Sequence, residues 1–317
     1  MNRIYLKGNK KEKLSQKSEQ ENIYSEYEDY MSSLFMRAHK GGSLLDYLCT
    51  LLRVSGLSYG HWDPFVEADE ALVEFSKLLK KNFVAKNQKL SIRLGLLIYC
   101  HATEMTAPYE ILGNLLKCKQ GKHFQWDPFF HLRIRDKKDF LRHILPSPKK
   151  KINFLDEDAK LAGEEKLIEI IRSFYDDELR NAFYHSDYCI TDDEFRIASG
   201  VGKSYTLDDI SLKLTKCFAF YNAFFNVYKA AKLAINTCER KVFKMPEYDT
   251  FEILTDSVDG LYGFKIHHSN GTFSEYHRRK DKSYSLNLSV EKEGISCFVG
   301  DLSTLDKKWK INGKELI

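Results

Sequence analysis

Apolar residues recur at helical spacing over most of the first 240 positions of the chain. This spacing predicts helices over residues 22–39, 43–54, about 63–83, 88–105 and about 108–117. Gly41-Gly42 ends the first of them, and Asp63-Pro64 resembles an N-cap followed by a first-turn proline. The following stretch, 118–155, is less regular and is interrupted by prolines.

Two long helices are expected after this stretch. The first runs from about residue 156 to 185, and the second, which carries an aromatic stripe, from about 207 to 238. Between them, residues 188–199 alternate around Asp192-Asp193 and predict a short β-hairpin.

Beyond Pro246 the apolar pattern changes to a period of two, which is typical of strands. Asn270-Gly271 is a strong signal for a two-residue hairpin turn, and that turn would place His268 opposite Phe273. We therefore expect a mainly α fold: a flexible basic tail over 1–20, a helical domain over 21–240 with the hairpin inserted, and a small antiparallel β meander over 247–317.

Composition and charge narrow the class of protein. Of the 317 residues, 43% are hydrophobic and 30% are charged, and no apolar run reaches the ~18 residues of a membrane span. Seven scattered cysteines without a CxxC pair favour a reducing cytoplasm and argue against a zinc site. The net charge of +4 resides entirely in residues 1–20, so it does not by itself indicate a nucleic-acid-binding face.

Local charge is more informative. Residues 131–151 carry eight Lys or Arg residues against two Asp residues. Contacts to RNA phosphates are one interpretation, and an ordinary solvated loop is an equally good one. The candidate RNA-binding residues are Arg133, Arg135, Lys149, Lys150 and Lys151.

Two patterns that resemble ligand sites fail on geometry. In the predicted hairpin, His268 and His277 lie four positions apart, roughly 13 Å, with His267 on the other face, so the three would not converge on a metal. SGVGKS, at 199–204, lacks the glycine that a phosphate-binding loop needs five positions before its Gly-Lys pair. We therefore expect neither a metal nor a cofactor.

Residues 176–188, DDELRNAFYHSDY, contain the strongest candidate for a catalytic site. An Arg-Asn pair followed at this spacing by histidine occurs by chance about 0.05 times in a chain of this composition. Asn181 and His185 are one helical turn apart, whereas Arg180 and His185 diverge by about 140° unless the helix ends near the histidine. A structural interpretation stays open: Arg180 could pair with Asp176 or Asp177, and His185 could cap the helix.

Arg180-Asn181, three residues and His185 at the end of a helix resemble the RNxxxH signature of the HEPN superfamily. The resemblance implies a helical bundle and a metal-independent endoribonuclease, often a toxin or antiviral defence effector, that acts as a homodimer with a composite site. It assigns His185 as general acid/base, Arg180 as phosphate clamp and Asn181 as the group orienting the histidine. It also allows an antitoxin or regulatory partner. The alternative is an inactive HEPN-fold protein that binds RNA or nucleotides.

Overall fold

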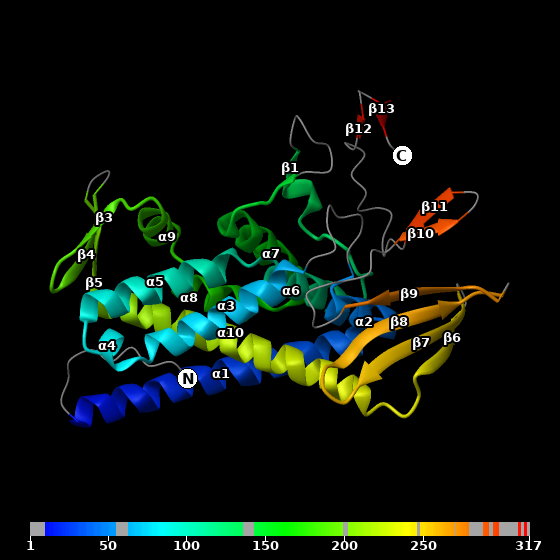
Figure 1. Cartoon of the computed structure of the whole chain (residues 1–317), viewed down its shortest axis with the longest axis horizontal. Helices are drawn as coiled ribbons and strands as arrows, with labels where there is room; N and C mark the ends of the chain where they lie inside the picture. The colour runs from blue at the N-terminus through cyan, green and yellow to red at the C-terminus, as the bar shows by residue number, and fades with distance from the viewer. Residues whose placement is uncertain are drawn as a thin grey trace. The chain divides into compact units, whose positions relative to one another are not determined.

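A computed structural model describes residues 10–54, 63–135, 143–198, 202–245, 248–269, 271–278, 288–291, 294–297, 310–311 and 314–315. The fold is mainly α with small antiparallel sheets, as predicted (Figure 1). The chain divides into two compact units, each made of three separate segments. The first unit comprises 1–32, 67–105 and 164–226, and the second comprises 33–66, 106–163 and 227–317. This division differs from the predicted boundary between 240 and 247.

The first unit is built around α8 (Glu165–Phe174). The unit also contains parts of α1 (Lys10–Gly41), α3 (Pro64–Leu79) and α10 (Leu207–Asn236), together with α4 (Asn82–Ala85), α5 (Gln88–Glu104) and α9 (Asp177–Tyr184). The hydroxyl of Tyr99 on α5 donates to the Phe174 carbonyl oxygen over 3.2 Å, and the Phe174 ring lies 5.2 Å from that of Phe220 on α10. These contacts join α5, α8 and α10, and all three helices contribute buried apolar side chains.

The long helix predicted over 156–185 is wrong, because the segment forms three helices. α7 (Pro148–Ala162) ends where Gly163 adopts a left-handed φ of 63° as its C-cap. α8 ends at Phe174, and the Asp176 side chain begins α9 by accepting a hydrogen bond from the Leu179 N–H over 3.1 Å. The motif therefore lies on a short helix of its own.

A small sheet follows α9 in the first unit. Its strands β3 (Tyr188–Ile190), β4 (Glu194–Ile197) and β5 (Ser204–Thr206) are antiparallel neighbours in that order. The predicted hairpin is thus confirmed and extended by a third strand. The rings of Phe183, on α9, and Tyr188 stack 5.4 Å apart, and Tyr188 stacks on Phe195 at 4.8 Å, so the sheet is fixed to the motif helix.

The second unit combines helices with the C-terminal strands. Its helical elements are α2 (Leu44–Leu52), α6 (Thr106–Lys119), the 3-10 turn η1 (Phe130–Leu132) and α7. Two strands of two residues each, β1 (Ile134–Arg135) and β2 (His143–Ile144), pair with each other. The main sheet has the order β6 (Val242–Met245), β7 (Tyr248–Asp256), β8 (Gly260–His267) and β9 (Phe273–His277), all antiparallel. Separate hairpins pair β10 (Leu288–Glu291) with β11 (Gly294–Cys297) and β12 (Lys310–Ile311) with β13 (Lys314–Glu315).

The main sheet packs against the end of α10 through a glycine. Gly260 has a φ of 68°, and a Cβ there would overlap the Lys232 carbonyl oxygen. Phe251, Phe264 and Tyr276 stack across neighbouring strands, with ring centroids 5.1 and 5.6 Å apart, and form the buried face of the sheet.

The predicted register of the β8–β9 hairpin is wrong by one residue. His267, not His268, pairs with Phe273, and His277 pairs with Gly263. The His268 N–H donates to the Thr272 carbonyl oxygen over 2.9 Å, and Gly271 has a φ of 81°, so the loop holds three residues rather than two. A local Asn-Gly signal selects a hairpin but does not fix its loop length.

Two further predictions concern the N-terminal segment and membrane-spanning helices. Helix α1 begins at Lys10, so half of the segment expected as a flexible tail is helical. No helix among the described residues is long and apolar enough to span a membrane.

Candidate functional site

Helix α9 ends in a hydrogen-bonded cap that places His185 at its C-terminus. His185 is the C-cap residue, and its N–H donates to the Asn181 carbonyl oxygen over 2.9 Å. Ser186 follows with a left-handed φ of 56°, and the N–H groups of Ser186 and Asp187 donate back to Phe183 and Ala182 at 3.2 and 2.9 Å. This is a Schellman motif with serine where glycine is usual. The prediction that the helix ends at the histidine is confirmed.

The start of α9 is anchored by Tyr99 and Asp176. Tyr99 is fully buried, and its hydroxyl accepts a hydrogen bond from the Asp176 N–H over 2.8 Å. The Asp176 carboxylate accepts a hydrogen bond from the Tyr205 hydroxyl at 3.1 Å and lies 3.4 Å from the ammonium of Lys213. With Leu179 and Ala182 buried, α9 is held at both ends and along one face.

Arg180 is oriented by two polar side chains and one ring. Its guanidinium forms an ion pair with Glu104, at the end of α5, and donates from Nη1 to the Asn181 amide oxygen over 2.6 Å. The guanidinium carbon lies 5.2 Å from the centroid of the Tyr184 ring. The structural interpretation predicted that Arg180 pairs with Asp176 or Asp177. An acidic side chain does pair with Arg180, but it is Glu104, on another helix.

His185 has a different environment. Its side chain is exposed, and no hydrogen bond or ion pair of its imidazole is formed with any residue that the structure describes. Arg180 and Asn181 thus touch each other directly, whereas His185 stands at the open end of the same helix. Neither the Arg180 nor the Asn181 side chain hydrogen-bonds the His185 imidazole within one chain.

Cys100 approaches the motif without offering a nucleophile. Its sulfur lies 4.0 Å from the Arg180 carbonyl oxygen. Burial raises the pKa of the Cys100 thiol to about 12, against a smaller opposing effect of Arg180. The thiol stays protonated at neutral pH, so the exposed imidazole is the group suited to move a proton.

Glu104 was missed by the sequence interpretation, although a signal for it exists. A carboxylate in the last turn of a helix faces the negative end of the helix dipole and is unfavourable without a partner. Glu104 occupies this position in α5 and finds Arg180 as its partner.

The basic residues of segment 131–151, in the second unit, differ in their exposure and in their partners. Lys149 and Lys150 are exposed, whereas Lys151 is only 1% exposed and donates to the Thr106 hydroxyl over 3.2 Å. Arg133 forms ion pairs with Asp127 and, at 3.9 Å, with Glu110. The side chain of Arg135 lies outside the described residues.

Lys151 is therefore not an exposed phosphate contact, contrary to the prediction. It lies on the buried face of α7 with Ile152 and Leu155, and its ammonium is 4.9 Å from the Tyr109 ring centroid. Burial lowers the pKa of Lys151 to about 8, although Glu110 acts in the opposite direction.

The two resemblances to ligand sites stay excluded on the observed geometry. With the corrected register, His267 and His277 share a face four positions apart, and they contact Glu252 at 2.8 Å and Glu275 at 3.3 Å respectively. No metal-binding cluster of His, Cys, Asp or Glu occurs among the described residues. Lys203 of the SGVGKS segment pairs with Glu178 of α9 over 2.7 Å and precedes the antiparallel strand β5 rather than a helix.

Comparisons with protein-family models, with curated proteins and with solved structures find no match to this chain. The resemblance to the HEPN signature is confined to the Arg180, Asn181 and His185 pattern at the end of a helix.

Proposed function

We propose that the chain is a metal-independent endoribonuclease with Arg180, Asn181 and His185 as its catalytic residues. The observation that carries the proposal is their arrangement on α9: a guanidinium oriented by Asn181 and Glu104, and an exposed imidazole where the helix ends. In RNA the 2′-hydroxyl is an internal nucleophile, so cleavage needs proton transfer and charge stabilisation.

The proposed reaction divides proton transfer and charge stabilisation between His185 and Arg180. His185 removes the proton of the 2′-hydroxyl, whose oxygen attacks phosphorus, and the imidazolium then gives a proton to the 5′ oxygen as the bond from that oxygen to phosphorus breaks. The planar Arg180 fork binds the charge that develops on the non-bridging oxygens. The products are a 2′,3′-cyclic phosphate and a 5′-hydroxyl end.

The resemblance to HEPN proteins supports the biological setting of the proposal. A toxin or antiviral defence role in the cytoplasm fits it, and an antitoxin or regulatory partner would hold the activity in check. The buried, unpaired thiols of Cys49, Cys100, Cys118 and Cys217 are compatible with a reducing compartment.

The test uses purified full-length chain with end-labelled tRNA and mRNA in excess EDTA. We expect cleavage, and we expect the 3′ ends to become ligatable only after the cyclic phosphate is opened and removed. Products with 3′-hydroxyl ends, or a requirement for added divalent metal, would contradict the mechanism.

A HEPN-like binding protein without catalysis is the second candidate, and one observation favours it. Glu104 occupies part of the Arg180 guanidinium, the group that a phosphate would need to contact. This candidate predicts RNA or nucleotide binding without cleavage in the same EDTA assay.

The proposal includes a homodimer with both copies of the motif around one cleft. Within one chain the Arg180 guanidinium contacts Asn181 and Glu104 but not the His185 imidazole, and an isologous contact duplicates every residue across the two-fold axis. Mixing Arg180→Ala chains with His185→Ala chains should restore about a quarter to a half of wild-type activity, because the heterodimer keeps one complete composite set. The measurement is RNA cleavage after co-refolding, with each variant alone as the control. A fully active monomer would sink the shared-site idea.

Glu104→Gln should bind RNA about two- to fivefold more tightly than the wild type, because the carboxylate competes with phosphate for Arg180. Stability should change by less than about 1 kcal/mol, since the side chains of Arg180 and Glu104 are 18% and 36% exposed. Filter binding at fixed salt measures the affinity, and Glu178→Gln is the matched control because Glu178 pairs with Lys203 instead. A loss of cleavage as large as that of Arg180→Ala would mean that Glu104 positions the arginine.

Replacing Lys149 and Lys150 by glutamine should weaken RNA binding and flatten its salt dependence. Each lysine that contacts a phosphate contributes about 0.7 to the logarithmic salt slope on single strands. Affinity measured at several salt concentrations gives this slope, and Lys122→Gln, another exposed lysine of the same unit, is the control. An unchanged slope in the double variant would leave the segment as a solvated surface.

A further inference from the structure

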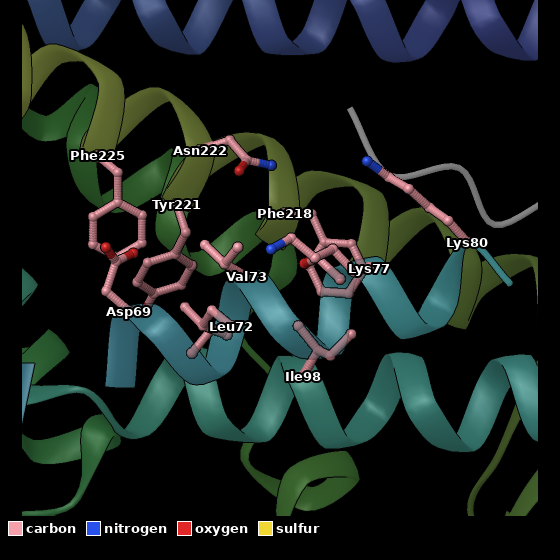
Figure 2. A pocket seen from close by; sticks show the side chains of 12 residues that line it. Asp69, Leu72, Val73, Lys77, Lys80, Ile98, Phe218, Tyr221, Asn222 and Phe225 are labelled. Carbon is pink, nitrogen blue, oxygen red and sulfur yellow. The ribbon is translucent and has the colours of Figure 1, made fainter. Parts of the chain in front are cut away.

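A cavity of about 260 Å³ lies within the first unit (Figure 2), and none of the motif residues lines it. Its walls come from α3, α5 and α10, and one side is aromatic, with Phe218, Tyr221 and Phe225 directed from α10 toward α3 (Figure 2). Leu72 of α3 and Ile98 of α5, both buried, complete the apolar surface. Flat apolar groups pack well against such rings at centroid distances of about 4.5–7 Å.

One end of the cavity is positively charged. Lys77, in the last turn of α3, and Lys80, just after that helix, line it with exposed side chains, and no ion pair of either is formed with any carboxylate of the described residues. Asp69 lies eight residues before Lys77, roughly 12 Å along the helix. An anionic group is therefore attracted to the lysine end.

The remaining polar groups are few. Ser76 and Asn222 add one hydroxyl and one amide to the lining. A nucleobase presents several donors and acceptors that must be matched, and drug-sized ligands occupy pockets of about 300–1,000 Å³. The cavity is smaller than that range, and its polar side chains suit a single anionic group rather than a nucleotide.

We propose that this cavity binds a small aromatic carboxylate, with its ring between α3 and α10 and its carboxylate at Lys77 and Lys80. The aromatic wall accounts for the ring and the lysine pair for the negative charge. The site is separate from Arg180 and His185, so the proposal stands independently of RNA cleavage.

Calorimetric titration of the full chain tests the proposal with indole-3-acetate and its neutral amide as probes. The acid should bind at least about fivefold more tightly than the amide, because only the acid pairs with the lysines. The double variant Lys77→Gln/Lys80→Gln should remove this difference, whereas Lys81→Gln, an exposed neighbour outside the cavity, should leave it unchanged.

A second variant tests the cavity itself. Val73 lines it and is 47% exposed, so Val73→Phe fills the space from its open side with little disturbance of the core. Both probes should lose binding in this variant while its melting temperature stays near that of the wild type. Equal binding of acid and amide, acid binding that survives Val73→Phe, or tighter binding of AMP than of the acid would each overturn the proposal.

Discussion

Replacement of His185 by alanine is expected to reduce RNA cleavage at least 100-fold while leaving the fold intact. General acid–base groups contribute roughly 10²–10⁴ to rate, and His185 is the exposed imidazole at the end of α9. Its side chain has no hydrogen bond or ion pair to any residue in the described ranges, so stability should change by less than about 0.5 kcal/mol. Single-turnover cleavage and thermal unfolding measure the two effects.

The matched control is His123→Ala, since His123 is also a surface histidine, with a side chain 77% exposed. It should cleave RNA at the wild-type rate. Full activity in His185→Ala, or an equal loss in both variants, would show that the motif histidine is not the proton-transfer group.

Replacement of Asp63 by alanine is expected to destabilise the second unit by about 3–5 kcal/mol, because it leaves Arg53, whose side chain is only 10% exposed, without its counter-charge. The Asp63 carboxylate accepts hydrogen bonds from Nη1 and Nη2 of Arg53 and, over 2.7 Å, from Nη1 of Arg278. The three side chains are 3%, 10% and 11% exposed. Arg278 follows β9 and also donates to the Leu52 and Arg53 carbonyl oxygens, so the cluster ties the main sheet to the end of α2.

Denaturant unfolding measures this loss, and Asp192→Asn is the control because the side chain of Asp192 is 90% exposed. A second replacement, Arg53→Met in the Asp63→Ala background, should recover part of the stability by removing the uncompensated charge of Arg53. A change below about 1 kcal/mol in Asp63→Ala would mean that the arginines reach solvent.

The pKa of Asp63 predicts how the stability of the fold decreases at acidic pH. Burial raises the pKa of Asp63, but Arg53 and then Arg278 more than offset this and lower it to about 2. Because the folded pKa lies below the unfolded value of about 3.9, the contribution is complete above pH 4 and is lost as the pH falls toward 2. It is on the order of 2 kcal/mol, and Asp63→Asn should lack this component in a pH series.

The helical class and the end of the motif helix could be predicted from the sequence because both depend on local signals. Apolar periodicity marks α5, α6 and α10, and Ser186-Asp187 marks the end of α9. The break between α7 and α8 also has a local cause, Gly163, which the apolar stripe outweighed in the prediction.

Partner choice could not be predicted in the same way. The acidic partner of Arg180 lies 76 positions earlier, at Glu104, and only the packing of α9 on α5 brings the two together. Lys151 shows the same limit, because a run of three lysines suggests a solvated surface. Its spacing to Leu155 puts Lys151 on the buried face of α7, where Thr106 and Glu110 become its neighbours.

By itself, the sequence determined the mainly helical class and the strands near the C-terminus, and it placed an arginine, an asparagine and a histidine near the end of one helix. Local hydrogen bonds and side-chain periodicity suffice for that, since they act within a few residues. Only the tertiary structure decided which charges are paired, which lysine is buried and where a cavity with a charged end remains. Those outcomes depend on contacts between segments far apart in the chain, such as Arg180 with Glu104 and Arg278 with Asp63.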